Sequence, residues 1–300
     1  MKRIRTVLGD LDPAGFGICD AHDHLFLRSV LLPGQELDDP AAAAAELAAF
    51  RAAGGRAVVQ WTPHGLGRHA AELPALARGS GVHLVAATGL HRAAHYERLP
   101  PLDTLAELFT GELTAGIRGT GVRAGLIKVA GAFHRLDPHA AATLHAAAAA
   151  HLATGAPIAV HHEHGTAAAE VLELLTGLGV PPGSVLLGHL GRFPDAGLHR
   201  ELAAAGAYLV FDGPSRAHHA TDWRLTELLA ALFEAGHGHR LLLGGDTTTA
   251  AARSVGADGP GMPHLLTALG PRLARTLGEP ALDLMLRQNP ARAFAVAWPA

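Results

Sequence analysis

Apolar and polar positions follow two alternating patterns along the chain. Short runs rich in β-branched and large apolar residues recur, each ended by Gly, Pro or a polar cluster, and longer Ala- and Leu-rich stretches lie between them. The short runs are typical of buried parallel strands and the longer stretches of helices. The predicted strands are Gly17–His22, Ala57–Thr62, His83–Thr88, Gly125–Ala130, Pro157–His161, Ser184–His189, Tyr208–Asp212 and Leu241–Asp246.

Helices are predicted between the strands and after the last one. After the eighth strand we expect a loop over Thr247–Pro263 and helices over His264–Leu277 and Pro280–Gln288. Asn289–Pro290 is expected to end the second of these helices, because a residue before proline disfavours the helical conformation. The predicted helices between strands are Pro40–Ala53, Ala70–Gly79, Asp103–Arg118, Pro138–Gly155, Thr166–Gly179, Pro194–Gly206 and Asp222–Gly236.

This order of elements predicts the fold class. Strands alternating with helices indicate βαβ units and a parallel sheet. Eight units without a linker favour an α/β fold closed into a (β/α)8 TIM barrel, which typically needs about 250 residues. The 300 residues, 49% of them hydrophobic, suit a single domain over residues 1–300. An open doubly wound sheet is the alternative, but it needs a Gly-rich turn after the first strand, where this chain reads DAHDHLFL.

Charge and cysteine usage narrow the function classes. The net charge is −3 with His neutral, and Lys and Arg do not cluster, which argues against a nucleic-acid partner. Cys19 is the only cysteine, so no intrachain disulfide can form. No apolar run has the length of a signal peptide or membrane span. We expect a cytoplasmic protein with a small-molecule substrate and no membrane partner, and a homodimer is compatible with the sequence.

Lys128 is unusual in its surroundings. Only Lys2 and Lys128 are lysines among 24 basic residues, and Lys128 lies in the apolar segment AGLIKVAG. An unpaired ammonium is costly to bury there. We interpret Lys128 as a Schiff-base amine or as a lysine carboxylated by CO₂, which can bridge two metals. A lysine that extends to water or pairs with a carboxylate is the alternative.

Histidine and aspartate residues lie at the ends of several predicted strands. The chain has 21 histidines, so a single one is weak evidence. His22 and His24 are two residues apart and therefore point to the same side of a strand. His161, His189 and Asp246 end the fifth, sixth and eighth strands. In a β/α barrel these ends form the active face, and imidazole and carboxylate ligands suit divalent transition metals.

This set of residues resembles that of the amidohydrolase superfamily and, more narrowly, the phosphotriesterase family, which includes phosphotriesterase-related proteins and phosphotriesterase-like lactonases. The segments TVLGDLDPAGFGICDAHDHLF, GLGRHAAELPALARGSGVHLVAATGLH, GPGMPHLL and NPARAF are similar to the opening, the second and third βα units and the last helices of that family. The resemblance extends from Thr6 to Phe294 and implies a metal-dependent hydrolase barrel.

The resemblance implies a binuclear metal centre. Two divalent cations are implied, zinc foremost, with manganese, cobalt or iron as alternatives. A CO₂-derived carbamate on Lys128 would bridge them together with a hydroxide. Asp246 is implied to be both a ligand and the catalytic residue that accepts the proton of the hydroxide. The implied ligands are His22, His24 and Asp246 for the more buried metal, His161 and His189 for the more exposed one, and Lys128 for both.

The implied reaction is attack of the metal-bridged hydroxide on a lactone, carboxylic ester or amide carbonyl. Paraoxon-cleaving members have an acidic residue and a histidine as a proton relay, where this chain has Arg192 and Gly213, so efficient phosphotriesterase activity is not expected. Where family lactonases often have a tyrosine, this chain has Leu90 and His91. His91 and Asp212 are candidates for substrate binding.

Other interpretations stay open. They are a phosphoester hydrolase, a mononuclear deaminase-like enzyme with Glu163 as its acid, a Schiff-base aldolase that uses Lys128, and a non-catalytic metal-binding protein. Arg192 and Arg216 are candidates to attract a carboxylate or phosphate. The polar residues interpreted as solvated loop residues are His134, His162, Glu163, His164, His218 and His219.

Overall fold

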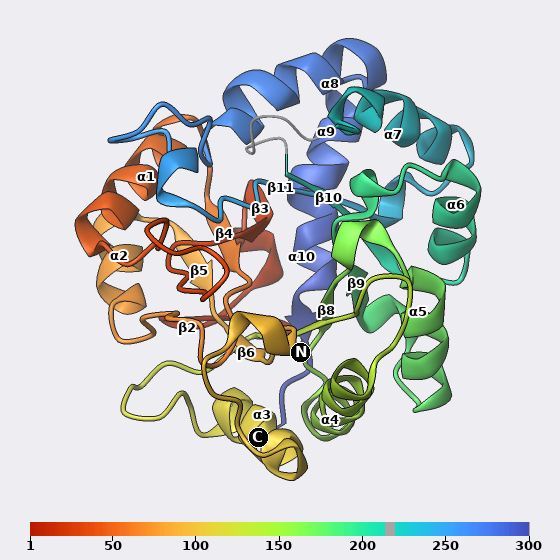
Figure 1. Ribbon diagram of the computed structural model, residues 1–300. Helices are drawn as coiled ribbons and strands as arrows, with labels where there is room; N and C mark the ends of the chain where they lie inside the picture. Colours follow the sequence, from red (N-terminus) through yellow and green to blue (C-terminus); the bar gives the residue numbers. More distant parts are fainter. Residues whose placement is uncertain (214–219, 300) are drawn as a thin grey trace.

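The chain folds as the predicted α/β barrel. The computed structural model describes residues 1–213 and 220–299, so the predicted positions Arg216, His218 and His219 lie outside the described residues. Figure 1 shows the strands gathered in the middle of the molecule, with the helices arranged around them. This arrangement confirms the α/β class inferred from the alternation of strands and helices.

The strands of the barrel run parallel. In the described part of the chain they form two hydrogen-bonded sheets, one ordered β3-β4-β5 and the other β11-β10-β9-β8-β7-β6. Their bounds are β3 Cys19–Asp23, β4 Ala57–Gln60, β5 His83–Val85, β6 Ala87–Gly89, β7 Leu126–Ala130, β8 Ile158–His161, β9 Val185–Leu187, β10 Tyr208–Asp212 and β11 Leu241–Gly244.

Two junctions join these sheets into one barrel. Only Ala86 separates β5 from β6, so the third predicted strand passes from one sheet into the other. At the other junction β11 lies against β3. The amide of Asp246 donates to the carbonyl of His22 at 2.9 Å. A Cβ on Gly244 would lie 2.7 Å from the Cβ of His22, so only glycine fits at this contact.

Helices follow the strands as predicted, within a few residues at their ends. Asp39 and Asp137 each cap a helix through a side-chain hydrogen bond, and proline follows at the first helical position. The helices are α1 Pro40–Ala52, α2 Leu73–Ser80, α3 Leu105–Thr114, α4 Pro138–Thr154, α5 Ala168–Gly177, α6 Ala196–Ala204, α7 Leu225–Glu234, α8 Gly270–Leu277, α9 Glu279–Asp283 and α10 Asn289–Ala293.

The prediction of a helix break at Asn289–Pro290 is wrong. A π-helical turn over Leu284–Gln288 runs directly into α10. Proline lacks an amide donor, and the wider π turn accommodates this loss without ending the helix. Asn289 is fully buried, and its side-chain amide donates to the carbonyls of Gly238 and Leu241. These bonds hold the end of the chain against the barrel.

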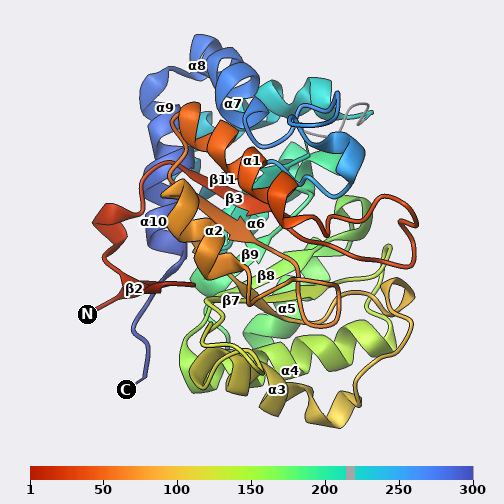
Figure 2. The ribbon, with the colours of Figure 1, turned by 90° about the vertical axis from the view of Figure 1, so that its left-hand side faces the viewer.

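The two ends of the barrel differ. In Figure 2 the chain termini lie at one end and the long loops after the strands extend from the other. At the end with the termini, β1 (Arg3–Thr6) pairs with β2 (Gly9–Leu11) and β12 (Ala295–Val296). No helix in the described part of the chain is long and apolar enough to cross a membrane.

Apolar side chains fill the barrel beneath the loops. Trp61 is fully buried, and its indole nitrogen donates to the carbonyl of Ala21 at 2.8 Å. Its ring stacks on the imidazole of His22, with 3.7 Å between the ring centroids. The core of the barrel therefore supports the first of the predicted metal ligands from below.

Candidate metal centre

The predicted ligands converge on one cavity at the carboxyl ends of the strands. The cavity has a volume of about 310 Å³ and an apolar wall formed by Leu27, Leu31, Leu32 and Leu66. All of the residues predicted from the sequence to bind metal line it, as does His91. They are His22, His24, Lys128, His161, His189 and Asp246.

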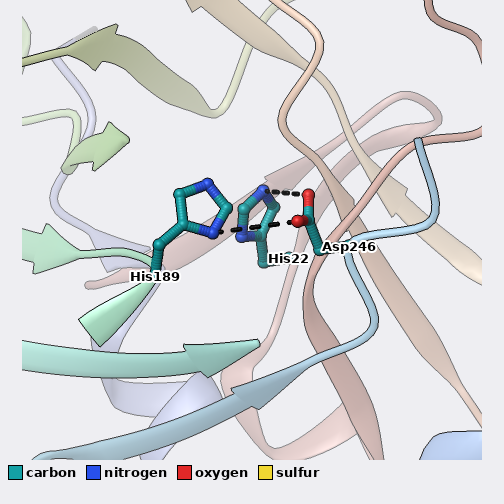
Figure 3. A group of neighbouring side chains, drawn as sticks. All are labelled: His22, His189 and Asp246. Atoms are coloured by element: carbon teal, nitrogen blue, oxygen red, sulfur yellow. Dashed lines mark ion pairs between the residues drawn. The ribbon is translucent and has the colours of Figure 1, made fainter. Parts of the chain in front are cut away.

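Three of these residues form a compact ligand group. His22, His189 and Asp246 are buried, and each offers one ligand atom within 4.8 Å of the others. Figure 3 shows both imidazoles facing the carboxylate, with 3.5 Å from Nε2 of His22 to Oδ1 of Asp246. Nε2 of His24 lies 3.6 Å from the same oxygen. Buried imidazole and carboxylate donors at this spacing fit a divalent transition metal.

Asp212 holds two of the imidazoles. Its two oxygens accept from Nδ1 of His22 at 2.7 Å and from Nδ1 of His189 at 2.6 Å. Burial raises the pKa of Asp212, but the two imidazoles outweigh burial and hold this pKa well below its usual value. Asp212, a candidate for substrate binding, therefore faces the imidazoles and is not among the residues that line the cavity.

The tautomer of His24 is fixed in a similar way. The hydroxyl of Thr62 donates to the carbonyl of Phe26 at 2.5 Å, so its oxygen accepts from Nδ1 of His24 at 2.7 Å. Nε2 of His24 then carries a lone pair on the side of Asp246. Hydrogen bonds of this kind orient metal-binding histidines and select the nitrogen that binds.

Burial keeps these imidazoles neutral. It lowers the pKa of His24 to about 4 and that of His189 to about 3, and it lowers the pKa of His161 well below its usual value. A neutral imidazole is the form that binds a metal. The site is therefore prepared for a cation at neutral pH.

Lys128 is buried in β7 and lines the cavity. Burial lowers the pKa of its amine to about 7, although the charge of Asp246 acts in the opposite direction. Gly89 pairs with Lys128 across the sheet, and a Cβ at Gly89 would lie 2.0 Å from the carbonyl oxygen of Lys128. The neighbouring strand therefore needs a glycine at this position.

Two of the predicted ligands lie just beyond their strands. His189 and Asp246 were predicted as strand ends, but β9 ends at Leu187 and β11 ends at Gly244. Both residues have positive φ angles, 63° and 56°, which are uncommon for residues other than glycine. Such conformations persist at functional sites where the surrounding contacts impose them. These turns direct both side chains over the end of the barrel.

Two residues predicted to be solvated are shielded from water, and one of them, Glu163, lines the cavity. His162 is fully buried, and Glu163 lines the cavity, where its Oε2 lies 2.9 Å from Nε2 of His161. That prediction was wrong for both, because a loop residue next to a strand end is covered by neighbouring loops. His134 and His164 are exposed, as predicted.

His91 lies among other imidazoles of the cavity. It is buried, and its ring centroid is 4.2 Å from that of His95 and 4.5 Å from that of His161. Nδ1 of His91 has no hydrogen-bond partner among the described residues. A buried ring nitrogen without a partner beside a cavity fits the predicted role in substrate binding.

A parallel β/α barrel with buried imidazole, carboxylate and lysine side chains at the carboxyl ends of its strands is the architecture of a metal-dependent hydrolase. The sequence model of the phosphotriesterase family matches residues 2–294. The chain therefore belongs to the phosphotriesterase family and is a hydrolase.

Individual relatives agree with this assignment. A lactonase from Listeria monocytogenes has a solved structure with a TM-score of 0.91 and 25% identity, over 97% of this chain and 98% of that one. The phosphotriesterase homology protein from Escherichia coli, solved with phosphate in its active site, has a TM-score of 0.87 and 29% identity, over 93% and 99%. A phospho-furanose lactonase from Mycoplasmopsis agalactiae is 28% identical over 75% of this chain and 70% of its own.

Proposed function

We propose that this protein is a binuclear metal-dependent hydrolase that opens lactones or cleaves carboxylic esters or amides. The observation that carries the proposal is the buried group of His22, His189 and Asp246, with ligand atoms within 4.8 Å of one another, in the same cavity as Lys128. The lactonases among the relatives support a lactone as the first substrate class to test.

The donor set of the cavity suits two cations, with zinc foremost and manganese, cobalt or iron as alternatives. When bound, the cations lower the pKa of water and polarise the oxygen of the scissile carbonyl. The residues that would hold them are His22, His24 and Asp246 on one side and His161 and His189 on the other, with Lys128 between.

Lys128 would act as an anionic ligand after it reacts with CO₂. Its amine nitrogen adds to the carbon of CO₂ and loses one proton, which leaves a carbamate. The reaction needs a neutral amine, and burial supplies one by lowering the pKa of Lys128 to about 7.

Asp246 would accept the proton released from the attacking water. Its carboxylate is buried beside the imidazoles of His22 and His24 and lines the cavity, which supports this role. The leaving group then receives this proton. A cavity of about 310 Å³ is at the small end of the range for ligand pockets, which favours a compact substrate with its apolar part against Leu27 and Leu66.

The proposal is tested by metal analysis and a substrate screen. Freshly purified protein should hold about two divalent metals per chain, and His189→Asn should hold fewer. His145→Asn is the control, because His145 is exposed on α4. Metal-loaded protein is then screened with lactones, esters, N-acyl amino acids and phosphoesters. At most one metal after loading with Zn²⁺ or Mn²⁺ and bicarbonate contradicts the binuclear centre, and turnover of phosphoesters alone contradicts the substrate class.

A further inference from the structure

Glu163 contacts three basic side chains at the edge of the cavity: its Oε1 lies 3.7 Å from Nε2 of His164. Its Oε2 lies 2.9 Å from Nε2 of His161 and 2.5 Å from Nη1 of Arg92. The side chain of Glu163 is 23% exposed and that of His161 is 14% exposed, so both are largely shielded from water. Arg92 belongs to the loop after β6, so these contacts tie that loop to the end of β8.

The same kind of contact occurs at the other imidazoles of the site. Asp212 holds Nδ1 of both His22 and His189, and Thr62 holds Nδ1 of His24. Each of these rings keeps its other nitrogen, Nε2, for a metal. His161 differs, because the carboxylate of Glu163 holds its Nε2 and leaves Nδ1 as the nitrogen that can bind.

The backbone after His161 places Glu163 at this position. His164, Gly165 and Ala167 all have positive φ angles, so the chain turns sharply after Glu163. The hydroxyl of Thr166 donates to the carbonyl of Glu163 at 2.8 Å and stabilises the turn. A Cβ on Gly165 would lie 2.8 Å from the carbonyl of His189, so the turn packs directly against the loop that carries His189.

We propose that Glu163 is a positioning residue that accepts the Nε2–H of His161 and thereby reserves Nδ1 of His161 for a metal, with Arg92 orienting the carboxylate. This inference rests on the proposed function, because it assigns a role toward the proposed metal centre. Carboxylates that receive the second N–H of a metal-binding histidine fix its tautomer and the orientation of its ring. The guanidinium of Arg92 donates to the same oxygen, which favours a carboxylate that accepts hydrogen bonds over the mononuclear alternative in which Glu163 serves as an acid.

The first test reads the tautomer of His161 without any metal. Two-bond ¹H–¹⁵N correlation spectra are recorded on metal-free, ¹⁵N-histidine-labelled protein, and His161→Asn identifies the signals of His161. The wild type should show protonated Nε2 and unprotonated Nδ1. Glu163→Ala should give a mixture of tautomers, whereas Glu163→Gln should keep the wild-type form, because the amide oxygen still accepts the hydrogen bond. Unchanged spectra in Glu163→Ala would overturn the proposal.

The second test measures metal affinity by competition with a chelator. Glu163→Ala should bind the second metal equivalent about 10–100-fold more weakly than the wild type. The affinity of Glu163→Gln should lie between those of Glu163→Ala and the wild type. Arg92→Gln should weaken metal binding less than Glu163→Ala does. Glu170→Ala is the control, because Glu170 is exposed on α5. Equal affinity in Glu163→Ala and the wild type would also overturn the proposal. If the wild type itself binds at most one metal, the binuclear function fails while the tautomer test still decides the role of Glu163.

Discussion

The guanidinium of Arg192 donates to Oδ2 of Asp246 at 2.6 Å. The other carboxylate oxygen, Oδ1, faces His22 at 3.5 Å and His24 at 3.6 Å. One oxygen of Asp246 therefore accepts from the guanidinium of Arg192, and the other faces the predicted metal ligands His22 and His24. Arg192 lies near the position at which the family resemblance implies an acidic residue in paraoxon-cleaving members.

We predict that paraoxon is a poor substrate. Arg192 lies near the first relay position and Gly213 occupies the second, so neither an acidic residue nor a histidine stands there to carry the proton away from Asp246. Steady-state kinetics with metal-loaded protein should give a kcat/KM far below the diffusion ceiling of about 10⁸ M⁻¹s⁻¹. A value near that ceiling would show that the relay is dispensable.

Removal of metal should lower the stability of the fold. A ligand that binds only the folded state at 100 times its Kd adds about 2.7 kcal/mol to the free energy of unfolding. Dialysis against a chelator should therefore lower the Tm, and Zn²⁺ or Mn²⁺ should restore it. Differential scanning calorimetry makes the comparison. If the Tm stays the same while elemental analysis shows that the metal has left, the metal was not bound selectively by the folded state.

Lys128→Ala should lose both metal and activity. An ammonium beside two cations would be repelled, so the proposed centre needs the carbamate on this side chain. Short carboxylic acids in the medium should partly restore metal binding by replacing the carbamate. Lys2→Ala is the control, because Lys2 is exposed at the amino terminus. In a crystal of the metal-loaded protein, side-chain density that ends at a bare amine would refute carboxylation.

Asp246→Asn should keep the fold and much of the metal but lower kcat by about 10²–10⁴-fold, equivalent to about 3–5 kcal/mol of barrier. The amide oxygen still binds a cation, but the amide does not accept a proton at neutral pH. The assay uses the best substrate of the screen at matched metal content. If the variant keeps more than about half of the wild-type kcat, Asp246 is not the base. His162 and Asp212 would then be tested in its place.

Acid should weaken the buried ion pair of Arg68 and Glu112, neither of which lines the cavity. Burial raises the pKa of Glu112, but hydrogen bonds from His64, Arg68 and Thr88 outweigh it and lower the pKa to about 2. Because the folded-state pKa is depressed, the stabilisation is present above the unfolded pKa of about 4.3 and is lost as pH falls from there toward about 2.

Glu112→Gln should therefore lower the free energy of unfolding by about 3 kcal/mol at pH 7 and flatten its decline below pH 5. Urea unfolding at a series of pH values measures both effects. Glu107→Gln is the control, because Glu107 lies in the same helix, α3, without a contact to Arg68 among the described residues. A variant with the wild-type pH dependence would show that Glu112 is not responsible for the acid sensitivity.

The sequence by itself determined the barrel and the face on which its site lies. The alternation of short apolar runs with helical stretches depends on local periodicity, and each run carries that signal within its own residues. In parallel βαβ units the carboxyl ends of the strands lie at the same end of the barrel, so His22, Lys128 and Asp246 were expected to converge. All three line the same cavity.

Only the tertiary structure decided which side chains hold these residues in place. Asp212 and His22 are far apart in the sequence, and their 2.7 Å contact depends on how β10 packs beside the ends of β3 and β9. Glu163 reaches His161 because the turn after β8 is packed against the loop of His189. The left-handed backbone of Asp246 likewise follows from contacts between β11 and β3. Such contacts arise from packing between distant segments, which local periodicity does not encode.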